Sequence, residues 1–244
     1  GLLGCWFQDT PVLRRARLQT LNLQGSHLPG LQADRLEARY DVFLREVVSA
    51  SEVRLLGARI GRDLDCYGGR FETPHVAETE RTVRDLTGRA LNAAGLEARG
   101  GVILRGVVAA GGVQLAGARI GGNLECDGGR FENPHDGEKE KTAPGSTGRA
   151  LSAAGLGTRG GVFLRGVFAA GGVRLLGARI GGNLECDGGR FENAGGKALS
   201  VDGARVTGAF FWRPDDNGNR PEAKGALDLT AAEIGHINDD PACW

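Results

Sequence analysis

The sequence predicts an all-β protein in which short strands wind into a four-sided parallel β-helix. Three observations lead to this prediction: a 60-residue internal repeat, apolar residues spaced five or six apart, and 42 glycines among 244 residues. The tetrad Gly-Ala-Arg-Ile falls at 57–60, 117–120 and 177–180. Self-similarity at a fixed period is typical of solenoids, in which stacked units bury one continuous core.

Apolar side chains recur at alternating intervals of five and six residues within each copy. This spacing excludes a helix, because a period of about 3.6 residues would carry such side chains around the axis. Each unit instead offers two inward-facing residues of an extended segment, followed by a glycine-bearing turn. Four units closing a square give one coil, so the chain supplies about eight or nine coils. The inward core positions of the three copies include Leu55, Ile60, Cys66, Phe71, Leu115, Ile120, Cys126, Phe131, Leu175, Ile180, Cys186 and Phe191.

The repeats predict a single solenoid over 1–244 that is interrupted by corner loops. The three copies span 33–71, 93–131 and 153–191. The interrupting segments are charged and proline-containing, and they lie at 72–88, 132–148 and 213–224. The third copy crosses the point of the first two interruptions with only the short segment 192–196. We therefore expect the longer segments to leave the coil as excursion loops.

From Leu13 onward the chain resembles the pentapeptide-repeat family of quadrilateral β-helices. The family's Ala-(Asp/Asn)-Leu pattern is loose here, and half of the units have six residues. The resemblance implies a right-handed parallel β-helix, that is, a quadrilateral solenoid of short strands with corner loops. Some members of that family protect DNA gyrase by imitating duplex DNA through an acidic face. This neutral chain with its rows of arginine fits such DNA mimicry poorly.

The glycine-rich units and the segment Asp239-Asp-Pro-Ala-Cys-Trp244 are also similar to a group of large actinobacterial repeat proteins. Members of that group are commonly labelled oxidoreductase or membrane-associated oxidoreductase. The resemblance therefore implies oxidoreductase activity as an alternative function. A flavin or nicotinamide bound to the purified protein would distinguish this alternative from a scaffold.

The charge balance gives no strong signal for nucleic acid. Lys plus Arg and Asp plus Glu number 30 each, so the net charge is zero and the pI is near 7.1. The five cysteines, three of which share one repeat position, are typical of buried thiols in a reducing compartment. No apolar run approaches the roughly 18 residues of a transmembrane segment. We expect a cytoplasmic protein, with peripheral membrane association as the alternative, and the absence of methionine is consistent with a segment of a longer protein.

Stacked copies align arginines into rows, and two rows are candidate partner-binding residues. They are Arg59, Arg119 and Arg179, and Arg70, Arg130 and Arg190. A stripe of guanidinium groups could hold phosphates or the carboxylates of a partner. The alternative is a solvated face whose arginines pair with neighbouring acids, each pair contributing only about 0–1 kcal/mol. The zero net charge favours this alternative.

A third row of arginines lies beside a row of acids, which also favours pairing within the chain. The arginines are Arg45, Arg105 and Arg165, and the acids are Asp65, Glu125 and Glu185. Because like positions of successive copies stack, each arginine of this row is expected close to an acid of the other.

The sequence gives no catalytic, cofactor or metal site. The segment 155–160 formally matches G-x-G-x-x-G, but that fingerprint needs a strand-to-helix turn, and the second copy lacks the middle glycine. Cys66 with His75, and Cys126 with His135, share a nine-residue offset. A core cysteine and a loop histidine do not supply the four ligands of structural zinc. We expect no cofactor and no metal, and we lean against an enzyme.

The sequence favours a non-catalytic repeat scaffold that binds another macromolecule, most simply a protein partner that the residues do not identify. Coil geometry accounts for nearly every position, and a filled β-helix leaves no cavity for a substrate. Aromatic residues near the two ends, Trp6 and Trp212, are expected to cap the core, because a solenoid needs its terminal coils covered. A homodimer through the terminal coils is the alternative use of these side chains.

Overall fold

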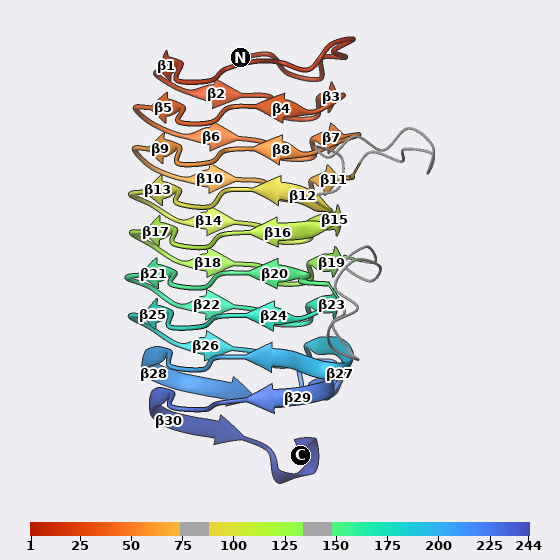
Figure 1. The fold of residues 1–244 in the computed structure, drawn as a ribbon, viewed down its shortest axis with the longest axis vertical. Coiled ribbons are helices and arrows are strands. Elements are labelled where there is room, and N and C mark those ends of the chain that lie inside the picture. Colours follow the sequence, from red (N-terminus) through yellow and green to blue (C-terminus); the bar gives the residue numbers. More distant parts are fainter. Residues whose placement is uncertain (74–87, 134–147) are drawn as a thin grey trace.

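The structure is a computed structural model that describes residues 1–73, 88–133 and 148–244. It confirms the predicted fold class: short parallel strands wind into a right-handed β-helix with four faces (Figure 1). Among the described residues the chain forms strands, turns and one short 3₁₀ helix, Pro241–Cys243. The described residues contain no helix with the length and apolar character needed to cross a bilayer.

Faces 1 and 2 are columns of two-residue strands that follow one another in each coil. Face 1 consists of β1 (Arg17–Leu18), β5 (Glu37–Ala38), β9 (Arg59–Ile60), β13 (Glu97–Ala98), β17 (Arg119–Ile120), β21 (Gly157–Thr158) and β25 (Arg179–Ile180). Face 2 consists of β2 (Leu21–Asn22), β6 (Val42–Phe43), β10 (Leu64–Asp65), β14 (Val102–Ile103), β18 (Leu124–Glu125), β22 (Val162–Phe163) and β26 (Leu184–Glu185). The longer strands β28 (Arg205–Trp212) and β30 (Glu233–Asp239) then extend both faces.

Faces 3 and 4 complete each coil. Face 3 consists of β3 (His27–Leu28), β7 (Val48–Ser49), β11 (Arg70–Phe71), β15 (Val108–Ala110), β19 (Arg130–Glu132) and β23 (Phe168–Ala170). Face 4 consists of β4 (Leu31–Gln32), β8 (Val53–Arg54), β12 (Arg89–Asn92), β16 (Gly112–Gln114), β20 (Leu151–Ser152) and β24 (Val173–Arg174). The strands β27 (Arg190–Ser200) and β29 (Glu222–Asp228) extend both of these faces.

Inward side chains from the four faces fill the axis of the solenoid. None of the twelve core positions named from the sequence is more than 3% exposed. Burial raises the pKa of the Cys66, Cys126 and Cys186 thiols, so these side chains stay neutral and act as small apolar groups. The interior is therefore a packed core of side chains.

The corner between faces 1 and 2 explains why the sequence repeats every two coils. From Asp63 onward, an Asn or Asp side chain in alternate coils accepts a hydrogen bond from a backbone N–H of the next coil. These bonds join Asp63 to Gly101 (2.6 Å), Asn123 to Gly161 (3.0 Å) and Asn183 to Ala209 (3.0 Å). A Cβ atom on Gly160 would overlap the Asn123 side-chain oxygen. Gly100, Gly160 and Gly208 therefore follow Asp63, Asn123 and Asn183, whereas Asp41, nearer the N-terminus, accepts the N–H of Asp63 at 3.1 Å and is followed by a coil with Arg62 at the equivalent position.

The first two predicted excursions lie almost wholly outside the described residues, which resume at Gly88 and Gly148. Their described flanks are the ends of face 3 and the starts of face 4, so both leave from the same corner (Figure 1). In the third copy β27 crosses this corner without interruption. Asn193 spans the crossing, because its side-chain amide donates a 2.9 Å hydrogen bond to the Lys197 carbonyl.

The excursion expected over 213–224 is shorter in the structure, because β29 already begins at Glu222. Asp215 organises the segment. Its carboxylate accepts hydrogen bonds from the backbone N–H groups of Asn217 (3.0 Å) and Asn219 (2.8 Å) and from the Asn219 side-chain amide (2.8 Å). These bonds, led by the Asn219 amide, lower the pKa of Asp215.

The tryptophans near the two ends of the solenoid differ in burial. Trp212 is 2% exposed and packs between Phe191 and Phe210, with ring centroids 6.0 Å away on each side. Its indole N–H donates a 3.0 Å hydrogen bond to the Cys243 carbonyl. Trp6, in contrast, is 76% exposed and stacks on the ring of His27. Trp212 thus completes the core, whereas Trp6 lies on the outside of the coil.

A buried carboxylate joins β29 to β27. Asp228 is 9% exposed; it pairs with Lys197 Nζ at 2.5 Å and accepts hydrogen bonds from Ser200 Oγ (2.9 Å) and Thr230 Oγ1 (2.6 Å). The bond from Lys197 is the largest of several causes that lower the pKa of Asp228 far below its ordinary value. The carboxylate is therefore held in its ionised form.

We expect Asp228→Asn to lower the free energy of unfolding at neutral pH. A folded-state pKa below the unfolded value means that the stabilisation is complete above the unfolded pKa, about 4, and is lost as the pH falls below it. The difference in urea midpoint between the wild type and Asp228→Asn should therefore shrink on acidification below about pH 4. A difference that stays constant from neutral to acidic pH would contradict this assignment.

Candidate functional site

Face 1 presents one continuous row of outward side chains that is dominated by charge. Strand register aligns Arg17, Glu37, Arg59, Glu97, Arg119, Gly157, Arg179, Arg205 and Glu233 in that order. We call this set the Arg/Glu row. Successive members lie one strand spacing apart, about 4.8 Å. The first of the two predicted arginine rows, Arg59, Arg119 and Arg179, is therefore one third of a mixed row.

The first five members of the Arg/Glu row pair with one another. Arg17 Nε lies 2.9 Å from Glu37 Oε2, and Arg59 lies 3.9 Å from Glu37 and 3.5 Å from Glu97. Arg119 Nη1 lies 3.7 Å from Glu97 Oε1. Each glutamate in this stretch is thus shared by the arginines above and below it. All of these side chains are more than a third exposed, so solvent weakens the individual pairs.

The alternation fails at Gly157, which occupies the place of a glutamate. Gly157 is aligned with Arg119 on one side and with Arg179 on the other. We call this position the Gly157 gap. Arg179 is exposed and makes no ion pair with any residue that the structure describes. Arg159, two residues after Gly157 in the same coil, is likewise exposed and without an ion pair within the described ranges.

A second irregularity follows directly. Arg205 stands next to Arg179 in the row, where the alternation would place an acid. Arg205 instead pairs with Glu233 in the following coil, with Nη2 2.6 Å from Oε2. A surface hollow of about 330 Å³ is lined by Arg179, Arg205 and Glu233, where Gly177 and Gly203 carry no side chains. The stretch from Arg119 to Arg205 therefore combines excess positive charge with open space.

The second predicted row lies on face 3, and the structure does not bring it together with the first. Arg130 pairs with Glu132, and Arg190 lies 2.5 Å from Glu192 and 3.5 Å from Glu222. Arg130 and Arg190 also lie over the two sides of Phe168, with guanidinium carbons 4.5 and 5.9 Å from its ring centroid. Arg70 is exposed and has no ion pair within the described residues. Most of the charge in this row is already balanced.

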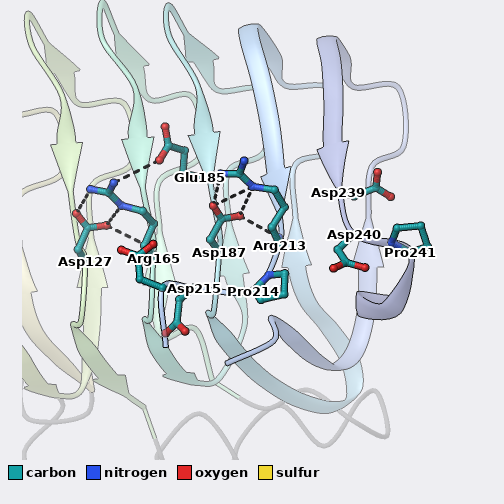
Figure 2. Close-up of a pocket in the computed structure, with 11 residues that line it drawn as sticks. Asp127, Arg165, Glu185, Asp187, Arg213, Pro214, Asp215, Asp239, Asp240 and Pro241 are labelled. Atoms are coloured by element: carbon teal, nitrogen blue, oxygen red, sulfur yellow. Dashed lines mark hydrogen bonds and ion pairs between the residues drawn. The ribbon is translucent and has the colours of Figure 1, made fainter. Parts of the chain in front are cut away.

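The third arginine row borders a groove of about 920 Å³ near the C-terminal end of the solenoid (Figure 2). Arg165 lies between Asp127 and Glu185, with Nη2 2.7 Å from Asp127 and Nη1 3.5 Å from Glu185. Arg213 lies 2.7 Å from Asp187 in the next coil. The hydrogen bonds that Arg165 donates to Asp127, and Arg213 to Asp187, raise the pKa of these two arginines. Both guanidinium groups of the groove are thus occupied.

Three further carboxylates of this groove also have structural partners. Asp215 closes the turn described above, Asp240 accepts a 2.8 Å hydrogen bond from the N–H of Ala242, and Asp239 accepts one from the indole of Trp244. In Figure 2, Asp215 lies below Arg165, and Asp239 and Asp240 lie to the right of Arg213. This groove therefore contains mostly satisfied charges. On face 1, in contrast, Arg179 and Arg159 have no ion pair among the described residues.

The structure shows where the G-x-G-x-x-G match and the two cysteines of the Cys/His pairs lie. The segment 155–160 spans a turn, β21 and the following corner, so the next element along the chain is another strand, β22. Cys66 and Cys126 point into the core, and their offset partners His75 and His135 lie outside the described residues. The described part of the chain contains no cluster of three or more potential metal ligands.

Comparison with known proteins adds no assignment. No family model matches the chain, and no curated protein matches it. The candidate site therefore rests on the geometry of face 1 alone. Sequence reasoning found Arg119 and Arg179 but missed Gly157, Arg159 and Arg205. The signal was present in the repeat: the second copy has Glu97 where the third has Gly157.

Proposed function

We propose that the chain is a non-catalytic solenoid scaffold that binds an acidic protein partner through face 1, between Arg119 and Arg205. The observation that carries this proposal is the uncompensated positive charge around the Gly157 gap in a chain whose net charge is zero. Elsewhere in the Arg/Glu row the arginines are paired within the solenoid. The proposal treats residues 1–244 as one continuous scaffold of the pentapeptide-repeat type.

An acidic protein suits this surface better than a nucleic acid. The exposed arginines are flanked in the same row by Glu97 and Glu233, which would repel a continuous phosphate backbone. A protein segment can place a single carboxylate beside an arginine and turn away before the next glutamate. Arginine also suits carboxylates, because its planar guanidinium donates two parallel hydrogen bonds.

The filled interior of the described coils is consistent with a scaffold. The axis is filled by side chains that are almost completely buried. The hollows described above lie on the outside, between rows of side chains. A flat, rigid and repetitive exterior is the kind of surface that solenoids use for macromolecular contacts.

The test is binding of fluorescein-labelled poly-L-glutamate, followed by anisotropy at low ionic strength, where exposed charges are least screened. We expect the wild type to bind and Arg179→Glu to bind roughly tenfold more weakly. Such a loss corresponds to about 1.4 kcal/mol, the scale of one lost exposed pair plus one new repulsion.

Arg149→Glu is the matched control, because Arg149 is exposed on another side of the coil and the substitution changes the net charge equally. It should leave the affinity unchanged. Equal weakening by Arg179→Glu and Arg149→Glu would show that net charge alone attracts the polymer, and the proposal would fail. Tighter binding of duplex DNA than of poly-L-glutamate by the wild type would point to nucleic acid instead.

A further inference from the structure

The second copy of the repeat shows how the Arg/Glu row accommodates a carboxylate. Glu97 stands between Arg59 and Arg119, aligned with both by strand register. Its Oε2 lies 3.5 Å from Arg59 Nε, and its Oε1 lies 3.7 Å from Arg119 Nη1. One carboxylate thus uses both oxygens to join two arginines that are about two strand spacings, or 10 Å, apart along the axis.

The third copy reproduces this arrangement without the carboxylate. Arg119, Gly157 and Arg179 are aligned by the same parallel register as Arg59, Glu97 and Arg119. A Cβ atom built on Gly157 would meet nothing within 4 Å, so the space outside the backbone is open. Arg179 has no ion pair with another described residue, and Arg119 has a partner only on its Glu97 side.

From this comparison we propose that the Gly157 gap is a binding site for one carboxylate, supplied by a glutamate or aspartate side chain of the protein partner. The carboxylate occupies the place that Glu97 occupies one copy earlier and joins Arg119 to Arg179. This inference rests on the proposed function of face 1 and names the group that face 1 recognises.

Neighbouring residues make the site selective for an isolated carboxylate. Arg159 lies on the same coil as Gly157, two residues further on, and its exposed side chain adds positive charge to this coil. Glu97 lies on the far side of Arg119, and Arg205 is already paired with Glu233. The gap therefore accepts a single negative group, and the adjacent acids disfavour a second one in the same row.

The inference predicts that a glutamate built into the chain will compete with the partner. In Gly157→Glu the new side chain would fill the gap and pair with Arg119 and Arg179, as Glu97 pairs with Arg59 and Arg119. We expect its affinity for an acetylated hexaglutamate peptide, measured by isothermal titration calorimetry, to fall at least tenfold. We also expect its melting temperature to be no lower than that of the wild type, because the alternation of charges is completed.

Two control variants isolate the cause. Gly157→Ala keeps the gap open, since its Cβ meets no neighbour, and should bind the peptide as the wild type does. Val108→Glu places the same new charge between Arg70 and Arg130 on face 3, where Val108 is aligned with both, and should also bind as the wild type does. Together they separate occupation of the gap from loss of glycine and from net charge.

The outcomes distinguish the site from the function on which it rests. Wild-type affinity in Gly157→Glu, together with weaker binding by Arg179→Glu, would reject the gap and leave face 1 as the binding surface. No difference between the wild type and Arg179→Glu would reject the proposed function itself. If inorganic phosphate displaced the peptide from the wild type at lower concentration than acetate, the site would be a phosphate site and the carboxylate assignment would be wrong.

Discussion

We expect Leu124→Asp to abolish the folded solenoid at neutral pH. Leu124 has no exposed surface and lies in β18, in the middle of face 2. Removing a buried leucine side chain costs about 2–5 kcal/mol, and burying an unpaired carboxylate adds several more. The sum is comparable to the whole stability of a typical domain, about 5–15 kcal/mol. Far-UV circular dichroism and gel filtration would show loss of strand signal and an expanded or aggregated chain.

The adjacent residue provides the control for this substitution. Glu125 follows Leu124 in the same strand and points outward, where it pairs with Arg105 at 2.9 Å. Glu125→Ala should remain folded and lose about 1 kcal/mol or less, as is typical of exposed ion pairs. A folded Leu124→Asp variant with unchanged hydrodynamic size would contradict the inward assignment of this position.

Gly121→Ala should be strongly destabilising although it adds a single methyl group. Gly121 lies at the corner after β17, where a Cβ atom would overlap the carbonyl oxygen of Arg99 in the preceding coil. That oxygen belongs to the backbone between Ala98 and Gly100, whose carbonyls accept 2.8 Å hydrogen bonds from the N–H groups of Gly121 and Gly122, so it cannot move without disturbing the contact between the coils. We expect a loss of about 3 kcal/mol in unfolding free energy, measured by urea denaturation.

Gly157→Ala is the matched comparison for Gly121→Ala, because Gly157 lies in the next coil with nothing within 4 Å of its Cβ position. Replacing a glycine with an unstrained backbone by alanine stabilises a protein by about 0.4–1 kcal/mol through the unfolded chain. The two substitutions should therefore have opposite signs. Equal effects would mean that the close approach of coils at the corner does not require glycine at position 121.

The fold could be predicted because one geometrical rule governs most residues. Apolar residues recur at intervals of five or six, and this interval determines which side chains point inward. The burial of Leu124, Cys126 and Phe131 follows from it. The two-coil period was visible in the sequence, but its cause was not. It depends on the contact between Asn123 in one coil and Gly160 and Gly161 in the next, which becomes apparent only when strands are in register.

The ends of the solenoid were harder to predict than the middle. In the sequence, Trp6 and Trp212 are both aromatic residues near an end of the repeat array. In the structure, Trp6 is exposed and stacks on His27, whereas Trp212 is buried against Phe191 and Phe210. Periodicity identifies a position on a coil but does not say whether another coil covers it. At Trp212 the covering comes from β30 and the segment around Cys243, which lie outside the regular repeat.

The candidate site could be predicted only in part. The sequence aligned Arg59, Arg119 and Arg179, because they share one position in three copies. It did not reveal that the intervening coils place Glu97 and Gly157 between them, since those residues belong to a different unit of the repeat. Pairing within the row is a matter of strand register. Which arginines of the row are paired and which are unpaired could therefore be determined only from the structure.

The most direct test of the binding surface is a map of the residues that an acidic ligand perturbs. Hexaglutamate should be titrated into ¹⁵N-labelled protein, and amide chemical shifts followed by nuclear magnetic resonance. We predict that the largest changes cluster on face 1, at Arg119, Gly157, Arg159 and Arg179. Changes centred instead on the C-terminal groove around Arg213 would contradict the assignment of face 1 as the binding surface.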